Sequence, residues 1–228
     1  MSDKEMTALI DEEPFASKMS FYKLVWIFVI GSIFGTWYEE ILTFARLGIW
    51  ENRSAVIIGP FNPLYGTAYV LAVVLFYKMK NPIVVLVLGA FAGGAFEYAA
   101  NWAQEFFTGS VSWDYNALYL NINGRTTVGY SVFWGILILM MVKLIYPFTS
   151  KWIERIPKRT GEVITKLLIV FLGVNMLITY SMLIRQGQRI KGIEPLTPIG
   201  QIYDEVFTDN KIKELFPNMV LNIGDNNE

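Results

Sequence analysis

The chain has 228 residues, of which 54% are hydrophobic and 15% aromatic, with a mean hydropathy of +0.39 and a net charge of −1. Because it contains neither cysteine nor histidine, disulfides, thiol chemistry, Cys/His zinc sites and imidazole catalysis are excluded. No basic arm interleaved with aromatics indicates nucleic-acid binding, and the residues predict no metal site and no cofactor. Several apolar runs approach bilayer length, so the composition predicts an all-α, multi-pass integral membrane protein in contact with lipid.

The first part of the chain predicts one ordinary span and one incomplete span. Residues 1–20 form a short polar arm without the pattern of a removable signal peptide, and the first span is expected over 21–45. The sequence GPFNPLYG at 59–66 then forbids a continuous helix. The following apolar run, 64–77, would be only about 21 Å long as a helix. Residues 56–63 must therefore supply membrane depth as irregular backbone, enclosed by protein or lining a wet cavity.

Three further spans complete a prediction of about five transmembrane helices. They are expected over 83–107, over 127–146, where Pro147 would stop the helix, and over 163–184, with Thr160 as the N-cap.

Two polar segments flank the fifth span. Residues 148–162 are expected to form a basic cytoplasmic loop, and residues 185–228 a short amphipathic tail. Within the tail, Thr197 with Pro198 is placed to start one helix and Asp209 another. The first would have an apolar side suited to a surface or a membrane interface, made by Ile199, Ile202, Val206 and Phe207.

An internal repeat organises residues 21–147. Two glycines and a glutamate, each four residues apart, occur at Gly31, Gly35 and Glu39 and again at Gly89, Gly93 and Glu97. Further matched pairs are Trp50 with Trp113, Gly59 with Gly124, Tyr65 with Tyr130 and Lys78 with Lys143. A spacing of four places each triplet on one helical face, where glycines let a partner helix approach closely. We therefore predict two tandem helical hairpins related by a parallel pseudo-twofold axis, which would bring both glycine faces and both acids together.

The distribution of lysine and arginine predicts the orientation. These residues are more numerous near the helix ends that share a side with the N-terminus, which favours a cytoplasmic N-terminus and an extracytoplasmic tail. Arg185, Arg189 and Lys191, directly after the fifth span, oppose this orientation. If they stayed inside, the tail would need a re-entrant or sixth segment, for which it lacks hydrophobicity.

The acids of the repeat are the centre of the candidate polar site. Glu39 and Glu97 lie about 20 to 26 Å along their spans, where a carboxylate costs a few kcal/mol and is rarely left facing lipid. The candidate site comprises Glu39, Glu97, Arg125, Asn101 and Glu40. Arg125 is the expected counter-charge, and one arginine between two acids leaves a surplus negative charge that holds a proton or attracts a cation. The alternatives are an acid and base pair of an embedded enzyme, or ion pairs that only lock the bundle.

The two outer loops supply a second set of candidates. An external vestibule would be lined by Arg53, Pro60, Asn62, Pro63, Tyr65, Trp113, Asp114 and Tyr115. The alternatives are that the Gly/Pro sequence only turns the chain and that the Trp and Tyr residues anchor it at the membrane interface.

Four segments carry a family resemblance. They read NRSAVIIGPFNPLYG (52–66), FEYAANWAQEFF (96–107), WDY (113–115) and NINGRTTVGYSVFWG (121–135). Together they resemble the putative ABC-transporter type IV family of small bacterial membrane proteins. The family pattern has Gly, Cys and Trp where this chain has Ser54, Asn62 and Ser112. The difference at Asn62 argues against a required thiol.

The resemblance implies a transport permease in a bacterial plasma membrane. The chain has no GxxxxGK[ST] loop, so any ATPase would be a separate subunit, and residues 148–162 are the loop on which it would dock. A homo-oligomer is also compatible with the sequence. The competing classes are a membrane-embedded enzyme acting on a lipid or cell-envelope substrate through Glu39 and Glu97, and a non-catalytic accessory or immunity-type protein. Of these classes, the sequence favours a protein that is not an enzyme.

Overall fold

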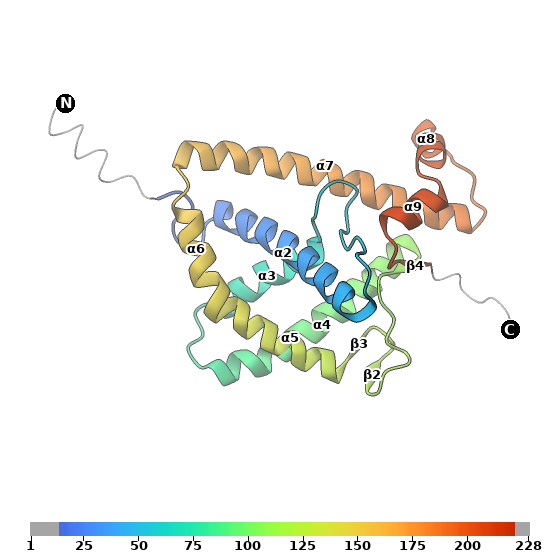
Figure 1. Cartoon of the computed structure of the whole chain (residues 1–228). Coiled ribbons are helices and arrows are strands. Elements are labelled where there is room, and N and C mark those ends of the chain that lie inside the picture. The colour runs from blue at the N-terminus through green and yellow to red at the C-terminus, as the bar shows by residue number, and fades with distance from the viewer. Residues whose placement is uncertain (1–13, 222–228) are drawn as a thin grey trace, which may run out of the picture.

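The computed structural model describes residues 14–221 (Figure 1). Residues 1–13 of the expected polar arm and residues 222–228 of the tail lie outside this description. The helices are α2 (Phe21–Leu47), α3 (Pro63–Phe76), α4 (Pro82–Thr108), α5 (Val128–Met140), α6 (Tyr146–Glu154), α7 (Lys158–Ile190), α8 (Pro198–Val206) and α9 (Asp209–Leu215). Four short strands form two antiparallel pairs, β1 (Ser110–Val111) with β4 (Val220–Leu221) and β2 (Asn121–Ile122) with β3 (Thr126–Thr127).

Between residues 14 and 221, four helical segments are long and apolar enough to cross a membrane. They are α2, α4, the continuous segment Val128–Glu154 and α7, while α3 is apolar but short. This agrees with the all-helical, membrane-spanning class predicted from composition. We call the end of the bundle that holds the start of α2 and the break at 155–157 the basic end, and the opposite end, with residues 109–127 and the tail, the loop end (Figure 1).

The first helix of each predicted hairpin ends in the same way. Gly48 after α2 and Gly109 after α4 adopt the left-handed conformation, with φ of 71° and 69°, and each returns a backbone hydrogen bond to the last turn. The second helix of each hairpin starts from a polar N-cap, Asn62 for α3 and Thr127 for α5. Glycine tolerates the positive φ, and the capping side chains satisfy the free N–H groups at the helix start.

Pro147 does not end the fourth span, so that expectation is wrong. A π-helical turn, η1 (Met141–Ile145), precedes it, and the helix continues as α6 to Glu154. Proline lacks an N–H and would clash with the carbonyl four residues earlier, and the wider π turn accommodates it. The chain breaks only at 155–157, and α7 then starts at Lys158 rather than at the expected cap Thr160.

The glycine faces pack inside each hairpin. A Cβ added at Gly35 would lie 2.2 Å from the ring of Tyr65 on α3, and one added at Gly93 would lie 2.4 Å from Cβ of Trp134 on α5. The glycines thus make room for aromatic side chains of the following helix. Our expectation that the two glycine faces meet each other is wrong, because these aromatic residues occupy the space.

The contacts also set the register between the two hairpins. Gly31 lies against Tyr69, with 3.0 Å from an added Cβ, whereas Gly93 lies against Trp134. Tyr69 and Trp134 are matched in the predicted repeat, since each follows its matched tyrosine by four residues. Gly31 therefore corresponds to Gly93 and not to Gly89. The first helices match with a shift of one helical turn from the alignment that the glycines predicted.

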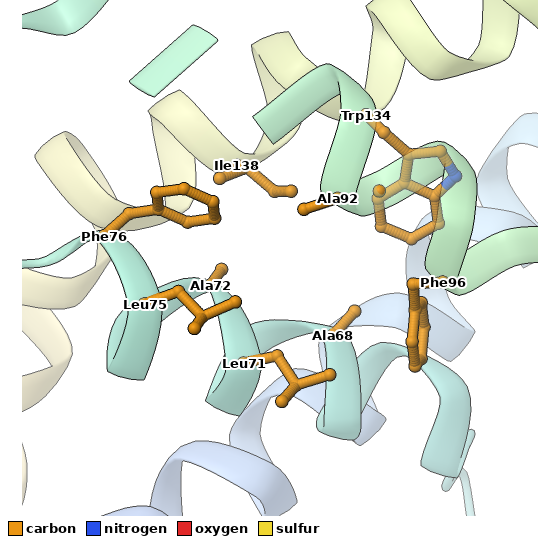
Figure 2. A pocket seen from close by; sticks show the side chains of 10 residues that line it. Ala68, Leu71, Ala72, Leu75, Phe76, Ala92, Phe96, Trp134 and Ile138 are labelled. Carbon is orange, nitrogen blue, oxygen red and sulfur yellow. The ribbon is translucent and has the colours of Figure 1, made fainter. Parts of the chain in front are cut away.

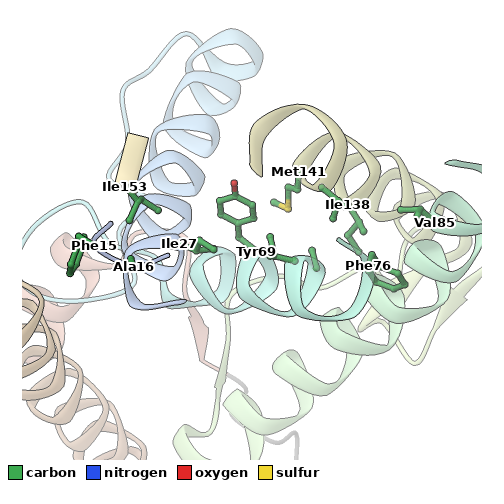
Figure 3. Packing of buried hydrophobic residues seen from close by; sticks show 12 residues of the cluster. Phe15, Ala16, Ile27, Tyr69, Phe76, Val85, Ile138, Met141 and Ile153 are labelled. Carbon is green, nitrogen blue, oxygen red and sulfur yellow. The ribbon is translucent and has the colours of Figure 1, made fainter. Parts of the chain in front are cut away.

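A single apolar cluster connects the two hairpins near the basic end (Figure 3). Helix α3 lies at its centre and contributes Tyr69 and Phe76, while Ile27 comes from α2, Val85 from α4 and Ile138 from α5. Burial of such side chains is worth about 1.5 to 3 kcal/mol each against water, and less against lipid.

Helix α7 covers one side of the irregular segment after α2, while Ile58 remains 58% exposed. The N–H groups of Ile57 and Ile58 donate to Thr179 Oγ1 and Asn175 Oδ1 on α7, both at 3.2 Å. Asn175 Nδ2 donates back to the Ile58 carbonyl at 2.7 Å. Two polar side chains in the middle of an apolar helix therefore satisfy the backbone groups of this segment, which hydrocarbon could not do.

The tail is fastened to the end of α7. Its helices start where Thr197 with Pro198 and Asp209 predicted them. Arg185 Nε donates to Asp204 at 3.0 Å, and Arg189 pairs with both Asp204 and Asp209. The Arg185 guanidinium, and after it Arg189, holds the pKa of the Asp204 carboxyl below its usual range. This stabilisation is present at neutral pH and is lost as the pH falls through the lowered pKa.

The tail also touches both outer loops. Ile212 and Phe216 pack on Met182 and Leu183 of α7, and Ile57 of the irregular segment packs against the same cluster. Strand β4 pairs with β1, which follows α4. The tail thus covers the loop end of the bundle.

Candidate functional site

Glu39 lies on α2 close to the loop end and is half-buried. Its carboxylate accepts a hydrogen bond from the Tyr65 hydroxyl at 2.6 Å. Tyr65 reaches it because its ring packs over Gly35, one turn before the acid. Within residues 14–221 Glu39 forms no ion pair; Arg53, the nearby cation, is hydrogen-bonded to Thr43 Oγ1 at 3.0 Å.

Glu97 lies on α4 and is more enclosed, with 5% of the residue exposed. Its carboxylate accepts from Thr126 Oγ1 at 2.6 Å and from the Tyr115 hydroxyl at 3.2 Å. The Trp134 side chain of α5 lies next to it. Glu97 likewise forms no ion pair with any of the described residues, and two hydroxyl groups and the Trp134 side chain surround it.

Aromatic side chains join the two acids. The rings of Tyr65 and Trp134 are 6.1 Å apart, and Tyr115 stacks on Tyr130 at 4.5 Å. Burial, followed by the charge of Glu97, raises the pKa of the Tyr115 phenol. The acids of the two hairpins therefore share one environment. We call it the Glu–Tyr cluster, composed of Glu39, Tyr65, Glu97, Tyr115, Tyr130 and Trp134.

The two acids do not occupy equivalent places. With the one-turn shift in register, Glu97 corresponds to Gly35, and Glu39 corresponds to Asn101. Glu39 thus lies one turn closer to the loop end than Glu97 does, by about 5.4 Å along the helix. Depth alone does not set the burial, because Asn101, which corresponds to Glu39, is 2% exposed.

Arg125 belongs to a different group of residues. It forms an ion pair with Glu105, donates to Asn101 Oδ1 at 2.8 Å and lies over the Tyr98 ring. It makes no hydrogen bond or ion pair with Glu39 or Glu97, so our expectation that it sits between the two acids is wrong. Glu105 lies two turns beyond Glu97 on the same helix, and the Arg125 guanidinium pairs with Glu105 instead.

Asn101 and Trp113 complete this second group, which we call the outer clamp together with Arg125 and Glu105. Asn101 is 2% exposed, and its Nδ2 donates to the Trp113 carbonyl at 2.9 Å. The Trp113 indole donates to the Arg125 carbonyl, also at 2.9 Å. The outer clamp therefore fixes the loop after α4 above the Glu–Tyr cluster.

The remaining predicted residues lie apart from the cluster. Glu40 is half-buried and has no hydrogen bond or ion pair among the described residues. Asp114 is exposed and accepts from the Asn116 N–H at 2.8 Å, which is a turn. Asn62 caps α3, whose first residue is Pro63, and Pro60 lies in the segment before it.

Three residues that lie beside the two acids were not predicted to belong to the site. Thr126 and Trp134 gave no signal of their own, whereas Tyr130 was matched to Tyr65 in the repeat without being assigned to the site. That match was the signal that could have found it.

A small apolar cavity of about 40 Å³ lies between the hairpins (Figure 2). It follows α3 from Ala68 to Phe76, with Ala92 and Ile138 on the opposite side. Trp134 and Phe96 close the end nearest the acids (Figure 2). The cavity extends from the Glu–Tyr cluster towards the basic end, but it is too narrow for a solute.

Comparison with known families assigns the chain to one family. The family model described as putative ABC-transporter type IV matches residues 26–180. The chain belongs to this family, as its sequence resemblance indicated. Family membership and the apolar helices together indicate a membrane protein related to transport. Neither the curated proteins nor the solved structures contain a match to the chain.

Proposed function

We propose that this protein is the membrane-embedded permease component of a bacterial transport system, and that it takes up a proton or a cationic solute at the Glu–Tyr cluster. The observation that carries the proposal is that two carboxylates, one from each hairpin, lie in one aromatic cluster and have no ion-pair partner among the described residues. Acids at membrane depth are costly unless a proton or a cation compensates them. Tyrosine and tryptophan faces attract cations in addition.

The apolar cavity supports a route through the protein. Cargo released from the acids towards the basic end would pass between α3 and α5, where Trp134 and Phe96 now close the way (Figure 2). In this proposal the structure represents a state closed towards the basic end, and moving one hairpin against the other opens it.

The proposed orientation places the basic end in the cytoplasm and the tail outside the plasma membrane. Pairing of Arg185 and Arg189 with acids of the tail supports it, because these arginines then act less as free positive charges. The absence of cysteine permits a labelling test. An impermeant maleimide should label Glu194→Cys in intact cells and Lys80→Cys only after lysis. The reverse pattern would refute this orientation.

An ATPase subunit would dock at the basic end in this proposal. Phe148 and Trp152 of α6 are 65% and 64% exposed, and their rings stack 6.3 Å apart beside the exposed Lys151. Exposed aromatic residues of this kind are common at protein interfaces.

The proposal is tested by purifying the tagged full chain from its native membrane and reconstituting the complex in liposomes. We expect an ATPase subunit to accompany it, and ATP hydrolysis in the liposomes to fall when Glu39 and Glu97 are both replaced by Gln. Glu40→Gln is the matched control, because Glu40 is a half-buried acid of the same helix outside the cluster. Unchanged hydrolysis in the double variant would refute the site. Consumption of a lipid or envelope substrate without any ATPase would instead favour an enzyme.

A further inference from the structure

A second cavity lies between the irregular segment after α2 and helix α7. It is a groove of about 440 Å³ between residues 57–58 and helix α7. Its α7 wall extends from Val170 to Ile178, and Phe207, which follows α8, lies at its edge. None of these residues belongs to the Glu–Tyr cluster or to the outer clamp.

The position of the groove along α7 sets the depth at which it lies. Residues 167–184 contain no charge, and as a helix this stretch is about 27 Å long, close to the hydrocarbon thickness. Lys166 precedes the stretch and Arg185 follows it. The groove from Val170 to Ile178 therefore lies wholly within the part of α7 that hydrocarbon surrounds.

The groove offers nothing for water or a polar ligand to bind. Asn175 is the one polar side chain in its lining, and its amide is already bonded to both backbone groups of Ile58. The remaining lining side chains are aliphatic or Phe. Water in such a groove would lose its hydrogen bonds, so the occupant must be apolar.

The volume of the groove distinguishes between two possible apolar occupants, a lipid acyl chain and a helix of another subunit. A helix about 10 Å wide that ran along the same stretch of α7, about 12 Å from Val170 to Ile178, would occupy about 940 Å³. The groove holds about 440 Å³, which lies in the usual range of sites for small ligands. Lipid is also the component present at this depth on the exposed face of α7, where Val170 is 64% exposed.

We propose that this groove is a binding site for one acyl chain of a membrane phospholipid. The chain lies between residues 57–58 and α7, and packs against the hydrogen bonds that hold the irregular segment to Asn175 and Thr179. A specifically bound acyl chain thus completes the enclosure of a segment that protein covers on one side only. This site does not depend on the proposed transport function.

The test uses the full chain in liposomes that contain a phospholipid with a diazirine on its acyl chain. After illumination, labelled positions are mapped by mass spectrometry. We expect labelling to concentrate on Ile58, Phe171 and Phe207, above that of Leu177, which is 70% exposed on α7 but outside the groove. Val174→Trp should fill the groove and lower this labelling about tenfold, the effect of excluding about two methylene groups.

Leu177→Trp is the matched control, because it adds the same ring to the same helix outside the groove. It should leave the labelling of Ile58 unchanged. If Val174→Trp lowers the thermal stability of the protein, the smaller Val174→Phe replaces it. Labelling that follows exposure alone, labelling unchanged by the filled groove, or crosslinks from these residues to a second copy or another subunit would each overturn the proposal.

Discussion

The hairpins α2–α3 and α4–α5 use one packing device but carry different charges. In both, glycines of the first helix receive aromatic residues of the second, and left-handed glycines end the first helix. At the basic end, the register that matches Gly31 with Gly93 also matches Lys23 with Val85, and these two residues are 1% and 0% exposed. The packing of the two hairpins is similar and their charges are not, so the difference between them lies in the polar residues.

The largest effect on stability is expected at Lys23, whose matched residue in the second hairpin is the apolar Val85. Lys23 is buried and forms an ion pair with Glu154 of α6, and it also donates to Ser150 at 2.8 Å. Glu154→Gln leaves a buried ammonium without its counter-charge. We expect a loss of about 2 to 3 kcal/mol in the free energy of unfolding, below the value for a fully enclosed pair because Glu154 is 34% exposed.

The comparison with Val85 supplies the control for this variant. Since the second hairpin packs an apolar side chain at this place, Lys23→Met combined with Glu154→Gln should recover most of the stability. Unfolding by SDS titration in mixed micelles measures both variants. A double variant no more stable than Glu154→Gln would show that the two hairpins are not interchangeable here.

The next effect tests the shared packing itself. An alanine methyl at Gly35 or Gly93 would lie 2.2 to 2.4 Å from atoms of Tyr65 or Trp134, so both helices must shift. Overpacking costs about 1 to 3 kcal/mol, and the better helix propensity of alanine returns up to about 1. We expect a net loss of about 1 to 2 kcal/mol for each substitution in the same unfolding assay.

Gly173 of α7 is the matched control for the glycine substitutions. An added Cβ there meets nothing within 4 Å, so Gly173→Ala should leave the stability unchanged or raise it slightly. If Gly35→Ala destabilises and Gly93→Ala does not, only one hairpin depends on the close approach.

Much of the fold could be predicted because its signals are local. The cap at Thr197 follows from residue chemistry, and the need to satisfy the backbone of residues 56–63 follows from hydrogen bonding in hydrocarbon. The prediction at Pro147 was wrong because the π turn before this residue lets the helix continue, and no pattern in the sequence predicts that turn.

The site was predicted only in part, because it depends on register. Glu39 and Glu97 could be singled out as acids in apolar spans. Which residue contacts which acid depends on a shift of one turn between the helices. Because the glycines recur every four residues in both helices, the two sequences can be aligned in either register. Arg125 was assigned to the wrong acid for the same kind of reason, since Glu105 is two turns further along the helix.

The third prediction contrasts the two acids. Gln at position 97 keeps one acceptor oxygen but turns its amide towards Tyr115 or Thr126, both of which donate to Glu97. A buried donor without a partner costs about 1 to 3 kcal/mol, and we expect a value near 1 to 2. Glu39→Gln should cost less than about 1 kcal/mol, because Tyr65 can donate to the amide oxygen and the half-buried amide can turn outwards. Equal losses in the unfolding assay would mean that the difference in burial has no energetic consequence.

The smallest effects on stability are expected when the tyrosine hydroxyl groups that donate to the two acids are removed. Among the described residues Tyr65 is the only hydrogen-bond donor to Glu39, at 2.6 Å, so Tyr65→Phe should cost about 1 kcal/mol. Tyr115 is 3.2 Å from Glu97, which keeps its bond to Thr126, and Tyr115→Phe should cost about 0.5 kcal/mol or less. Double-mutant cycles with the matching Gln variants isolate each coupling. A coupling at Tyr115 equal to that at Tyr65 would contradict the assignment, because Thr126 would then not be the principal donor to Glu97.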